Sequence, residues 1–340
     1  MLAAVLTCDF LISPALVDAD SVSDRIDDLV ALSALLQNGG HTVLIEDDAM
    51  EQLMLSNRYP TEPLFEQQLK RSGVSAYSPR DVTKTVNRLL SQATEISRAE
   101  PELLVETVFN GSDPVFERIT DDRRQALQGV LTNVAIRSAF SRLQASILHS
   151  CKVNRFETIS IDALINYMIP AHDKTFPFQF TAPVSIHHSY AEFLDSADGE
   201  SLYNAAQTEH DIKIAIFVAA RRRRYAAGID VSAFSAEYFS LGASFVTSLR
   251  RNQCQGGHKF GSAAFDAAAD IVSGCSGRDE NPFWSNENAG EAREYNGYKA
   301  YRTHISKKNE GMRLMFWKSG SGHIVLANVG PKSELQIDRP

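Results

Sequence analysis

Acidic side chains follow two apolar stretches near the start of the chain. Asp9 lies inside the apolar run 2–13, and Glu46 and Asp47 follow the run 41–45. In a parallel α/β sheet the carboxyl ends of the strands share one edge, so we expect these side chains to converge. Converging carboxylates repel one another unless a hard cation such as Mg²⁺ neutralises them. Such a metal activates water against a phosphodiester, so these three residues are candidate metal ligands and catalytic groups.

The same acidic residues also have a purely structural interpretation. Asp27 and Asp28 fit the solvated face of a helix, and Asp47 or Asp48 fits the N-cap of the next helix. Both interpretations stay open at the level of sequence. The arrangement of the carboxylates in space decides between them.

Basic and aromatic side chains gather in the stretch 295–335. Guanidinium and ammonium groups bind backbone phosphates, and aromatic rings stack on bases. The candidate nucleic-acid-binding residues are Arg302, Lys307, Lys308, Trp317 and Lys332. His304 and Arg313 are candidate catalytic groups, because histidine titrates near neutral pH and a guanidinium stabilises charge on a scissile phosphate without a metal. The alternative is a small sheet with solvated cations and an aromatic core of its own, or a protein-binding surface.

Two other clusters have weaker interpretations. The arginines at 221–224 lie on a predicted helix and wrap around it, so they cannot all share one face. They predict either a phosphate-facing subset or an electrostatic seam against the acidic first half of the chain. His187 and His188 are adjacent on a strand and point to opposite faces, so we interpret them as surface residues and not as a metal pair.

Apolar periodicity predicts alternating strands and helices in the first half of the chain. The predicted strands there are 2–13 and 41–45, and the predicted helices are 23–37, 49–55, 63–71, one that begins at residue 79, and 121–149. Later predicted helices are 206–225, 233–251 and 260–276, and later predicted strands are 298–305, 312–318 and 323–330.

This order predicts an α/β fold, α+β overall, in three segments. Residues 1–150 form a parallel α/β domain with a helical extension, 151–254 form a mainly helical middle region, and 255–340 form an α+β domain with a small antiparallel sheet.

The amino-acid composition limits the classes of protein to which this chain can belong. The chain is 44% apolar and 22% charged, which is typical of a folded globular protein and excludes a disordered one. No stretch reaches the ~18 uncharged apolar residues of a membrane span. The four cysteines are scattered without a C-x-x-C pair, which favours reduced thiols and a cytoplasmic location.

Charge is distributed unevenly along the chain, whose net charge is −8. Residues 1–120 carry 19 acidic and 9 basic side chains, whereas residues 281–340 carry 9 basic and 6 acidic ones. The acidic first third argues against nucleic-acid binding by the whole surface. It leaves room for a local basic patch.

Three motifs follow one another near the C-terminus. They read Gly297-Tyr298-Lys299-Ala300-Tyr301-Arg302, Met312-Arg313-Leu314 and Val325-Leu326-Ala327-Asn328-Val329-Gly330-Pro331-Lys332. In order and spacing they resemble the strands of the RelE/ParE family of small bacterial toxins, with 260–276 as the preceding helix. The resemblance implies an antiparallel sheet that contacts RNA and is clamped by an antitoxin. The Tyr that RNA-cleaving members often place after the last basic residue is absent after Lys332.

The run Thr7-Cys8-Asp9-Phe10-Leu11-Ile12-Ser13 resembles the opening of PIN-type nucleases, D-T-N-V-L-I-S. The resemblance implies a PIN-like domain within 1–150 and metal-dependent phosphodiester cleavage. Thr7 stands where that family has its first catalytic Asp, and Asp9 follows two residues later.

Together these patterns predict an effector, or a subunit, of a prokaryotic toxin–antitoxin or antiphage defence system that acts on RNA or DNA as a nuclease. Its expected partners are nucleic acid and a protein of the same system, and its expected cofactor is Mg²⁺. The alternative is a non-catalytic adaptor whose RelE-like sheet binds a partner protein or tethers nucleic acid. Thr7 in the place of the PIN Asp, and the missing Tyr, favour this alternative.

Overall fold

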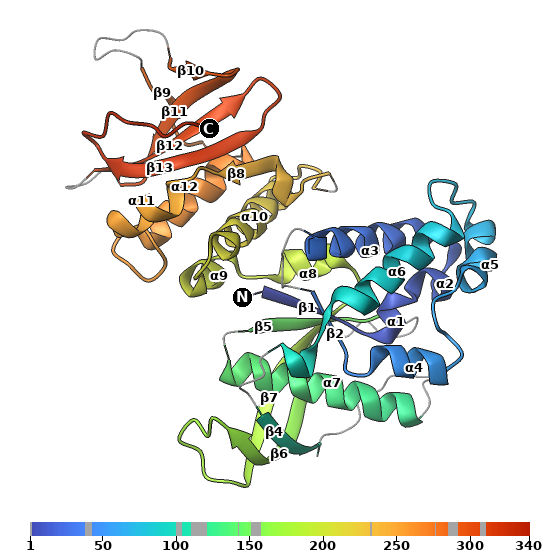
Figure 1. Cartoon of the computed structure of the whole chain (residues 1–340). Helices are drawn as coiled ribbons and strands as arrows, with labels where there is room; N and C mark the ends of the chain where they lie inside the picture. The colour runs from blue at the N-terminus through green and yellow to red at the C-terminus, as the bar shows by residue number, and fades with distance from the viewer. Residues whose placement is uncertain are drawn as a thin grey trace. The chain divides into compact units, whose positions relative to one another are not determined.

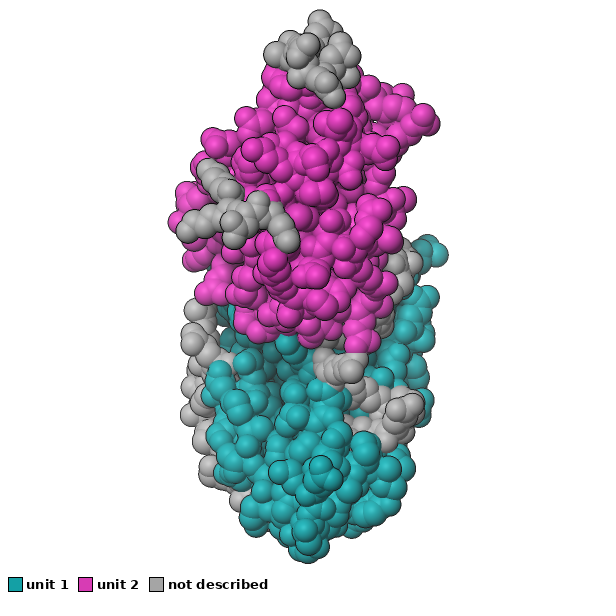
Figure 2. Space-filling view, turned by 90° about the vertical axis from the view of Figure 1, so that its left-hand side faces the viewer, with its two compact units in different colours: residues 1–196 teal, residues 197–340 magenta. Residues whose placement is uncertain are grey.

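Strand β1 (Leu2–Leu6) is an interior strand of the first sheet, and all five of its residues are buried. The computed structural model describes residues 2–37, 43–99, 104–109, 121–141, 143–150, 158–231, 233–275, 277–284, 292–306 and 311–340. The chain divides into two compact units, Met1–Ser196 (unit 1) and Ala197–Pro340 (unit 2), which Figure 2 colours separately.

The sheet of unit 1 has the strand order β3-β2-β1-β5-β7-β6-β4. Its strands are β2 (Val43–Ile45), β3 (Thr94–Glu95), β4 (Leu104–Phe109), β5 (Gln144–Leu148), β6 (Thr158–Ile169) and β7 (Phe178–His187), in addition to β1. The pairs that join β3, β2, β1, β5 and β7 are parallel, and β6 pairs antiparallel with both β7 and β4. The predicted mixed α/β fold is confirmed.

Helices cover both faces of this sheet. They are α1 (Cys8–Leu11), α2 (Ser13–Leu16), α3 (Val22–Gln37), α4 (Ala49–Leu55), α5 (Glu62–Ser72), α6 (Pro79–Gln92), α7 (Asp121–Phe140) and α8 (Tyr190–Ser196). Figure 1 shows α7 on one side of β1 and β2, and α3 and α6 on the other. Helix α6 begins where the sequence predicts, because Ser78 and Asp81 form a capping box at its first turn.

Three parts of the sequence prediction for unit 1 are wrong. The run 2–13 leaves the strand at Leu6, because the Thr7 hydroxyl accepts the N–H of Phe10 and caps α1. The helix predicted for 121–149 ends at Phe140, and β5 follows. The segment 151–254 contains the strands β6 and β7, so it is less helical than predicted, and the boundary between the units falls after Ser196.

In its described residues, unit 2 combines four α-helices with a six-stranded sheet. Its helices are α9 (Gly199–Ala205), α10 (Glu209–Ala226), α11 (Phe245–Arg251) and α12 (Gly261–Ser273). Its strands are β8 (Phe239–Leu241), β9 (Asn281–Pro282), β10 (Glu294–Tyr295), β11 (Tyr298–His304), β12 (Met312–Ser319) and β13 (Ile324–Pro331). All pairs are antiparallel except that of β13 with β8, so the predicted antiparallel C-terminal sheet is confirmed in its main strands. The helix predicted at 233–251 begins only at Phe245, after β8.

Strands β12 and β13 of the C-terminal sheet are largely buried on both faces. Helices α10, α11 and α12 contact strands β8, β13 and β12. A second, smaller core contains Phe283, Ala300, Met315, Trp317, Val325 and Ala327. Because side chains alternate along a strand, Met315 and Trp317 belong to this small core, while Leu314 and Phe316 point the opposite way. The small core is formed against the segment near Phe283 and the tail residue Ile337.

Candidate functional site

Three charged side chains meet at the carboxyl ends of the parallel strands in unit 1. Arg123, in the first turn of α7, donates from Nε to Asp9 Oδ2 at 2.9 Å and from Nη1 to Glu46 Oε1 at 2.6 Å. Its Nη2 also donates to Glu46 Oε2 at 2.9 Å. Asp9 follows β1 and Glu46 follows β2, so one guanidinium joins the ends of two neighbouring strands to α7. We call Asp9, Glu46 and Arg123 the carboxylate cluster.

The groups around the carboxylate cluster are neutral or only weakly paired with it. His149 follows β5, and its Nδ1 lies 3.1 Å from Thr7 Oγ1 and 3.9 Å from Asp9 Oδ2. Burial lowers the pKa of His149 to about 4, against the opposing attraction of Asp9, so the imidazole is neutral at pH 7. Burial also raises the pKa of the Cys8 thiol, and Glu46 adds to this rise. Arg58, half exposed, lies 3.9 Å from Asp9 Oδ1.

The position of the carboxylate cluster agrees with the rule for ligand sites in open α/β sheets. The neighbours of β1 are β2 on one side and β5 on the other, so the chain reverses its direction of strand addition at β1. Ligands of such sheets bind at this reversal, outside the carboxyl ends of the strands. In this structure the guanidinium of Arg123 lies there, and it keeps a high pKa despite burial because Glu46 and Asp9 surround it.

The predicted Mg²⁺ ligands converge only in part. Asp9 and Glu46 meet, but on a guanidinium. Asp47 accepts instead from the N–H of Ser97 at 3.0 Å and from the amide of Asn133 at 3.3 Å. Within the described ranges, no group of three or more His, Cys, Asp or Glu side chains is arranged to hold a metal. As placed, these residues do not fit a bound Mg²⁺, and metal binding stays a prediction.

The structural interpretation of the acidic residues is also only partly correct. Asp48 occupies the N-cap position of α4, but it has a φ of 55° and its side chain makes no capping hydrogen bond. Asp28 is not a solvated helix residue, because its side chain is only 14% exposed, and this burial raises its pKa to about 6. Its carboxylate pairs with Arg25 at 3.0 Å.

A second polar site lies in unit 2, where β9, β11 and β12 meet. Arg302, His304 and Arg313 line a cavity of about 210 Å³, together with Asn281, Pro282, Trp284 and Thr303. The sheet register explains the grouping, because His304 pairs with Arg313 and Arg302 pairs with Asn281. Arg302 and His304 are two residues apart on one strand and so share a face. We call this site the basic cavity.

Like charges gather in the basic cavity. Burial lowers the pKa of Arg313, and the charge of Arg302 lowers it further. None of the described residues that line the cavity is acidic. Arg313 donates from Nη1 to the carbonyl of Lys332 at 3.3 Å, and the Arg302 guanidinium lies 5.4 Å from the centre of the Phe283 ring. The two guanidinium groups repel one another, and no lining carboxylate compensates them. They are therefore suited to bind an anion such as a phosphate.

The other predicted nucleic-acid-binding residues have different environments. Trp317 is only 3% exposed, and its indole N–H donates to the carbonyl of Asp338 at 2.6 Å. It is therefore part of the small core and does not offer a stacking face, which corrects the prediction. Lys332 is exposed, whereas Lys307 and Lys308 lie outside the described residues.

Sequence reasoning missed Trp284, which lines the basic cavity and is 36% exposed. The signal available in the sequence was a tryptophan in a polar stretch, Asn281-Pro282-Phe283-Trp284-Ser285-Asn286.

The remaining clusters have contacts inside their own units. Arg221 donates to the carbonyl of Val231 at 2.7 Å, Arg223 pairs with Asp266 at 2.6 Å, and Arg224 lies over the Phe234 ring at 4.8 Å. All three therefore join elements of unit 2. Arg222 is exposed, and both interpretations of the arginine run stay predictions. His187, interpreted as a surface residue, is buried and lies 3.1 Å from the hydroxyl of Ser196.

No protein-family model, curated protein or solved structure matches this chain. The RelE/ParE and PIN resemblances therefore stay predictions. Among the described residues, no helix combines the length and the apolar character that crossing a membrane requires.

Proposed function

We propose that this protein binds nucleic acid and that the basic cavity holds a backbone phosphate. The observation that carries the proposal is the pairing of Arg302 and Arg313 in one cavity without a lining carboxylate. In the described part of the chain, neither arginine forms an ion pair. A phosphate would supply the missing negative charge and accept several N–H donors at once.

The partly exposed aromatic ring beside the cavity favours a single strand. The volume of about 210 Å³ leaves room for one phosphate with its sugar. Trp284 offers a partly exposed ring on which an unpaired base stacks. We place the protein, as the motif resemblances imply, in the cytoplasm as a subunit of a prokaryotic toxin–antitoxin or antiphage defence system.

The proposal is tested by titrating the full chain with labelled single-stranded RNA and DNA over a range of salt concentrations. Arg302→Gln and Arg313→Gln should each weaken binding about tenfold, because each removes a charge-assisted hydrogen bond to phosphate. Lys299→Gln is the matched control, since Lys299 carries the same charge on the same strand but pairs with Glu294 at 3.3 Å. Equal losses in all three variants, or no binding at low salt, would contradict the proposal.

Cleavage of RNA at the same cavity is a second candidate, favoured by the register that sets His304 opposite Arg313. In this reaction His304 would take the proton of a ribose 2′-hydroxyl, whose oxygen attacks the phosphorus. The bond from phosphorus to the 5′-oxygen breaks, the leaving oxygen takes a proton from water, and a 2′,3′-cyclic phosphate forms. Arg313 would stabilise the charge on the phosphate oxygens.

One assay distinguishes nucleic-acid binding alone from binding followed by RNA cleavage. RNA that carries a single 2′-deoxy nucleotide should bind normally but resist cleavage at that position. His304→Gln should abolish cleavage and leave binding within about twofold. Binding without any cleavage product rules out the second candidate and leaves the first. Cleavage only with Mg²⁺, lost in Glu46→Gln, would instead support the metal-dependent site predicted from sequence.

A further inference from the structure

The basic cavity holds two positive charges that none of its described lining residues balances. Arg302 on β11 and Arg313 on β12 both line it, and a guanidinium stays protonated in proteins. Burial, and then the charge of Arg302, lowers the pKa of Arg313. An anion with two negative charges neutralises such a pair, whereas an anion with one leaves a positive charge uncompensated.

The other lysines and arginines of these two strands are already paired. On β11, Lys299 Nζ lies 3.3 Å from Glu294 Oε1, and on β12, Lys318 forms an ion pair with Glu280. Proteins that bind single strands along their length offer a positively charged groove that follows the backbone. On β11 and β12 the arginines without a described carboxylate partner lie instead in one cavity. This arrangement suits one highly charged group better than a row of singly charged ones.

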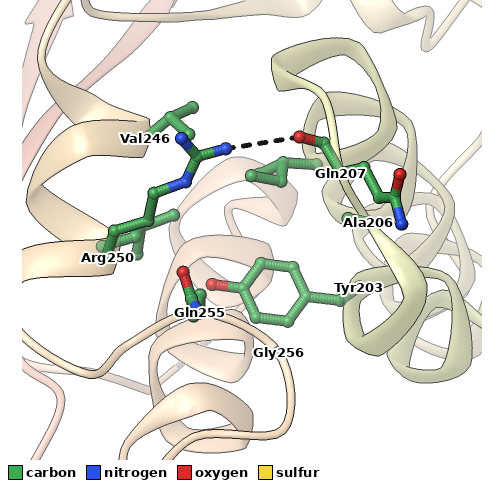
Figure 3. Close-up of a pocket in the computed structure, with 9 residues that line it drawn as sticks. Tyr203, Ala206, Gln207, Val246, Arg250, Gln255 and Gly256 are labelled. Carbon is green, nitrogen blue, oxygen red and sulfur yellow. Dashed lines mark hydrogen bonds between the residues drawn. The ribbon is translucent and has the colours of Figure 1, made fainter.

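A larger cavity of unit 2, of about 300 Å³, does not have this double charge (Figure 3). It lies among α9, α10 and α11, and Arg250 is the one charged side chain among the described residues that line it. The Arg250 Nη2 donates to the carbonyl of Gln207 at 3.3 Å, the contact drawn as a dashed line in Figure 3. Of these two cavities, the basic cavity is the one that brings two guanidinium groups together.

Trp284 lines the basic cavity with the two arginines, and a third arginine holds its backbone. The carbonyl of Trp284 accepts from Arg293 Nε at 3.1 Å, and Trp284 also forms a β-bridge with Ala292. The last base of a single strand has one face without a neighbouring base, and a partly exposed ring covers such a face by stacking. A strand end therefore offers a base for Trp284 and a phosphate for the arginines.

We propose that the basic cavity binds the terminal phosphate of a single strand, a phosphomonoester, in preference to an internal phosphodiester. An internal phosphodiester carries one negative charge, whereas a phosphomonoester carries about 1.5–2 at pH 7 and has three oxygens that accept hydrogen bonds. The second charge neutralises the second guanidinium, and the additional oxygen accepts another N–H. The inference rests on the proposed nucleic-acid binding. It is incompatible with RNA cleavage at this cavity, because the cleaved phosphorus carries a nucleotide on each side.

Titration of the full chain with single-stranded RNA of one sequence tests the proposal, using strands with hydroxyl groups at both ends, with a 5′-phosphate, or with a 3′-phosphate. One phosphorylated form should bind about tenfold more tightly than the unphosphorylated strand, because it adds a charge-assisted hydrogen bond. Capping that phosphate as its methyl diester removes one charge and one terminal oxygen, and it should cancel most of the gain. Equal affinities of all three strands would overturn the proposal and leave nucleic-acid binding standing. Failure of every strand to bind would contradict both.

Variants of the chain show whether the two arginines cause the preference. In Arg302→Gln and in Arg313→Gln the preference for the phosphorylated strand should fall from about tenfold to about twofold, because one guanidinium needs only one negative charge. Lys299→Gln is the matched control and should keep the full preference, because Lys299 does not line the cavity. A preference that persists in both arginine variants, or a methyl diester that keeps the gain, would overturn the proposal.

A mononucleotide separates a strand end from a free nucleotide as the ligand. The matching mononucleotide, 5′-AMP or 3′-AMP, should bind about tenfold more weakly than the phosphorylated strand, because it has no second phosphate to reach exposed cations such as Lys332. A mononucleotide that binds as tightly as the strand would assign the cavity to free nucleotides and overturn the proposal.

Discussion

The carboxylate cluster of unit 1 pairs opposite charges, whereas the basic cavity of unit 2 brings like charges together. In the first, Arg123 satisfies Asp9 and Glu46 with three nitrogen atoms, and Glu46 is 1% exposed. In the second, Arg302 and Arg313 lie together, and their mutual repulsion contributes to the lowered pKa of Arg313.

The difference separates a structural role from a binding role. Opposite charges that pair inside a protein neutralise one another, and removing either one leaves an uncompensated buried charge. Like charges that lie together in a cavity repel one another, and only a bound ligand of opposite charge compensates them. The position of Asp9 and Glu46 at the carboxyl ends of the strands first suggested that unit 1 held the ligand site. The charges indicate that the basic cavity is the better candidate, and that Arg123 mainly fixes α7 to the sheet.

Removing the guanidinium from unit 1 should have the largest effect on stability. We expect Arg123→Met to lower the free energy of unfolding by about 3–5 kcal/mol, because Asp9 and Glu46 then lose their counter-charge. Denaturation in urea measures the loss. Arg58→Met is the control, and it should cost less than about 1 kcal/mol because Arg58 is 50% exposed and 3.9 Å from Asp9. A loss of similar size in both variants would mean that the cluster does not fix α7.

Acid should weaken unit 1 through His149. Its pKa of about 4 in the folded state lies below the ordinary value of 6.5, so between these pH values only the unfolded state binds the proton. Stability therefore falls as the pH drops from 6.5 to 4. We expect the wild type to lose about 3 kcal/mol more than His149→Gln between pH 7 and pH 4.

The difference between the two proteins is the quantity to measure, because Asp28 titrates in the same range. Burial raises the pKa of Asp28 from 3.8 to about 6, so the folded state binds that proton first and is stabilised as the pH falls. This contribution is present in both proteins and cancels. Parallel stability curves for wild type and His149→Gln would show that His149 is not held neutral by burial.

Trp284 should report nucleic-acid binding directly, because it is one of two tryptophans and the other, Trp317, is buried. Single-stranded oligonucleotide should quench the tryptophan emission of the wild type and of Trp317→Phe. In Trp284→Leu the quenching should disappear, and affinity should fall by about 1–3 kcal/mol for the lost stacking. Unchanged emission of the wild type at saturation would place the bound strand away from the basic cavity.

Removing a cation from unit 2 should have the smallest effect on stability. Arg302→Gln loses the contact with the Phe283 ring, which is worth about 0.5–1 kcal/mol, and relieves repulsion with Arg313. We expect the free energy of unfolding to change by less than about 1 kcal/mol. The slope of log affinity against log salt concentration should decrease in magnitude by about 1, the contribution of one phosphate contact. A loss comparable to that of Arg123→Met would show that both sites are structural.

Much of the local structure could be predicted from the sequence. The apolar period of 23–37 lies within α3, and α6 begins at Pro79 as predicted, directly after its N-cap Ser78. The three strands near the C-terminus were found within a residue or two at each end, because alternation and turn residues are local signals. The same alternation sets Arg302 and His304 on one face of β11, and both line the basic cavity.

Contacts between distant segments could not be predicted in this way. Arg123 lies 114 residues from Asp9 and 77 from Glu46, and no local pattern marks it as their partner. The strand order decides which ends meet, and that order depends on pairing across the whole of unit 1. The helix predicted through 149 ends earlier because β5 is needed beside β1.

The two tryptophans also separate what the sequence predicts from what contacts between distant segments decide. The sequence shows that both rings lie near basic residues, and it predicted only Trp317 as a nucleic-acid-binding residue. Tertiary structure decided otherwise, because the tail returns over the sheet and the carbonyl of Asp338 accepts the Trp317 N–H. Trp284 is left partly exposed at the cavity. Burial depends on what covers a residue, and the covering segment here lies 21 residues from the ring it covers.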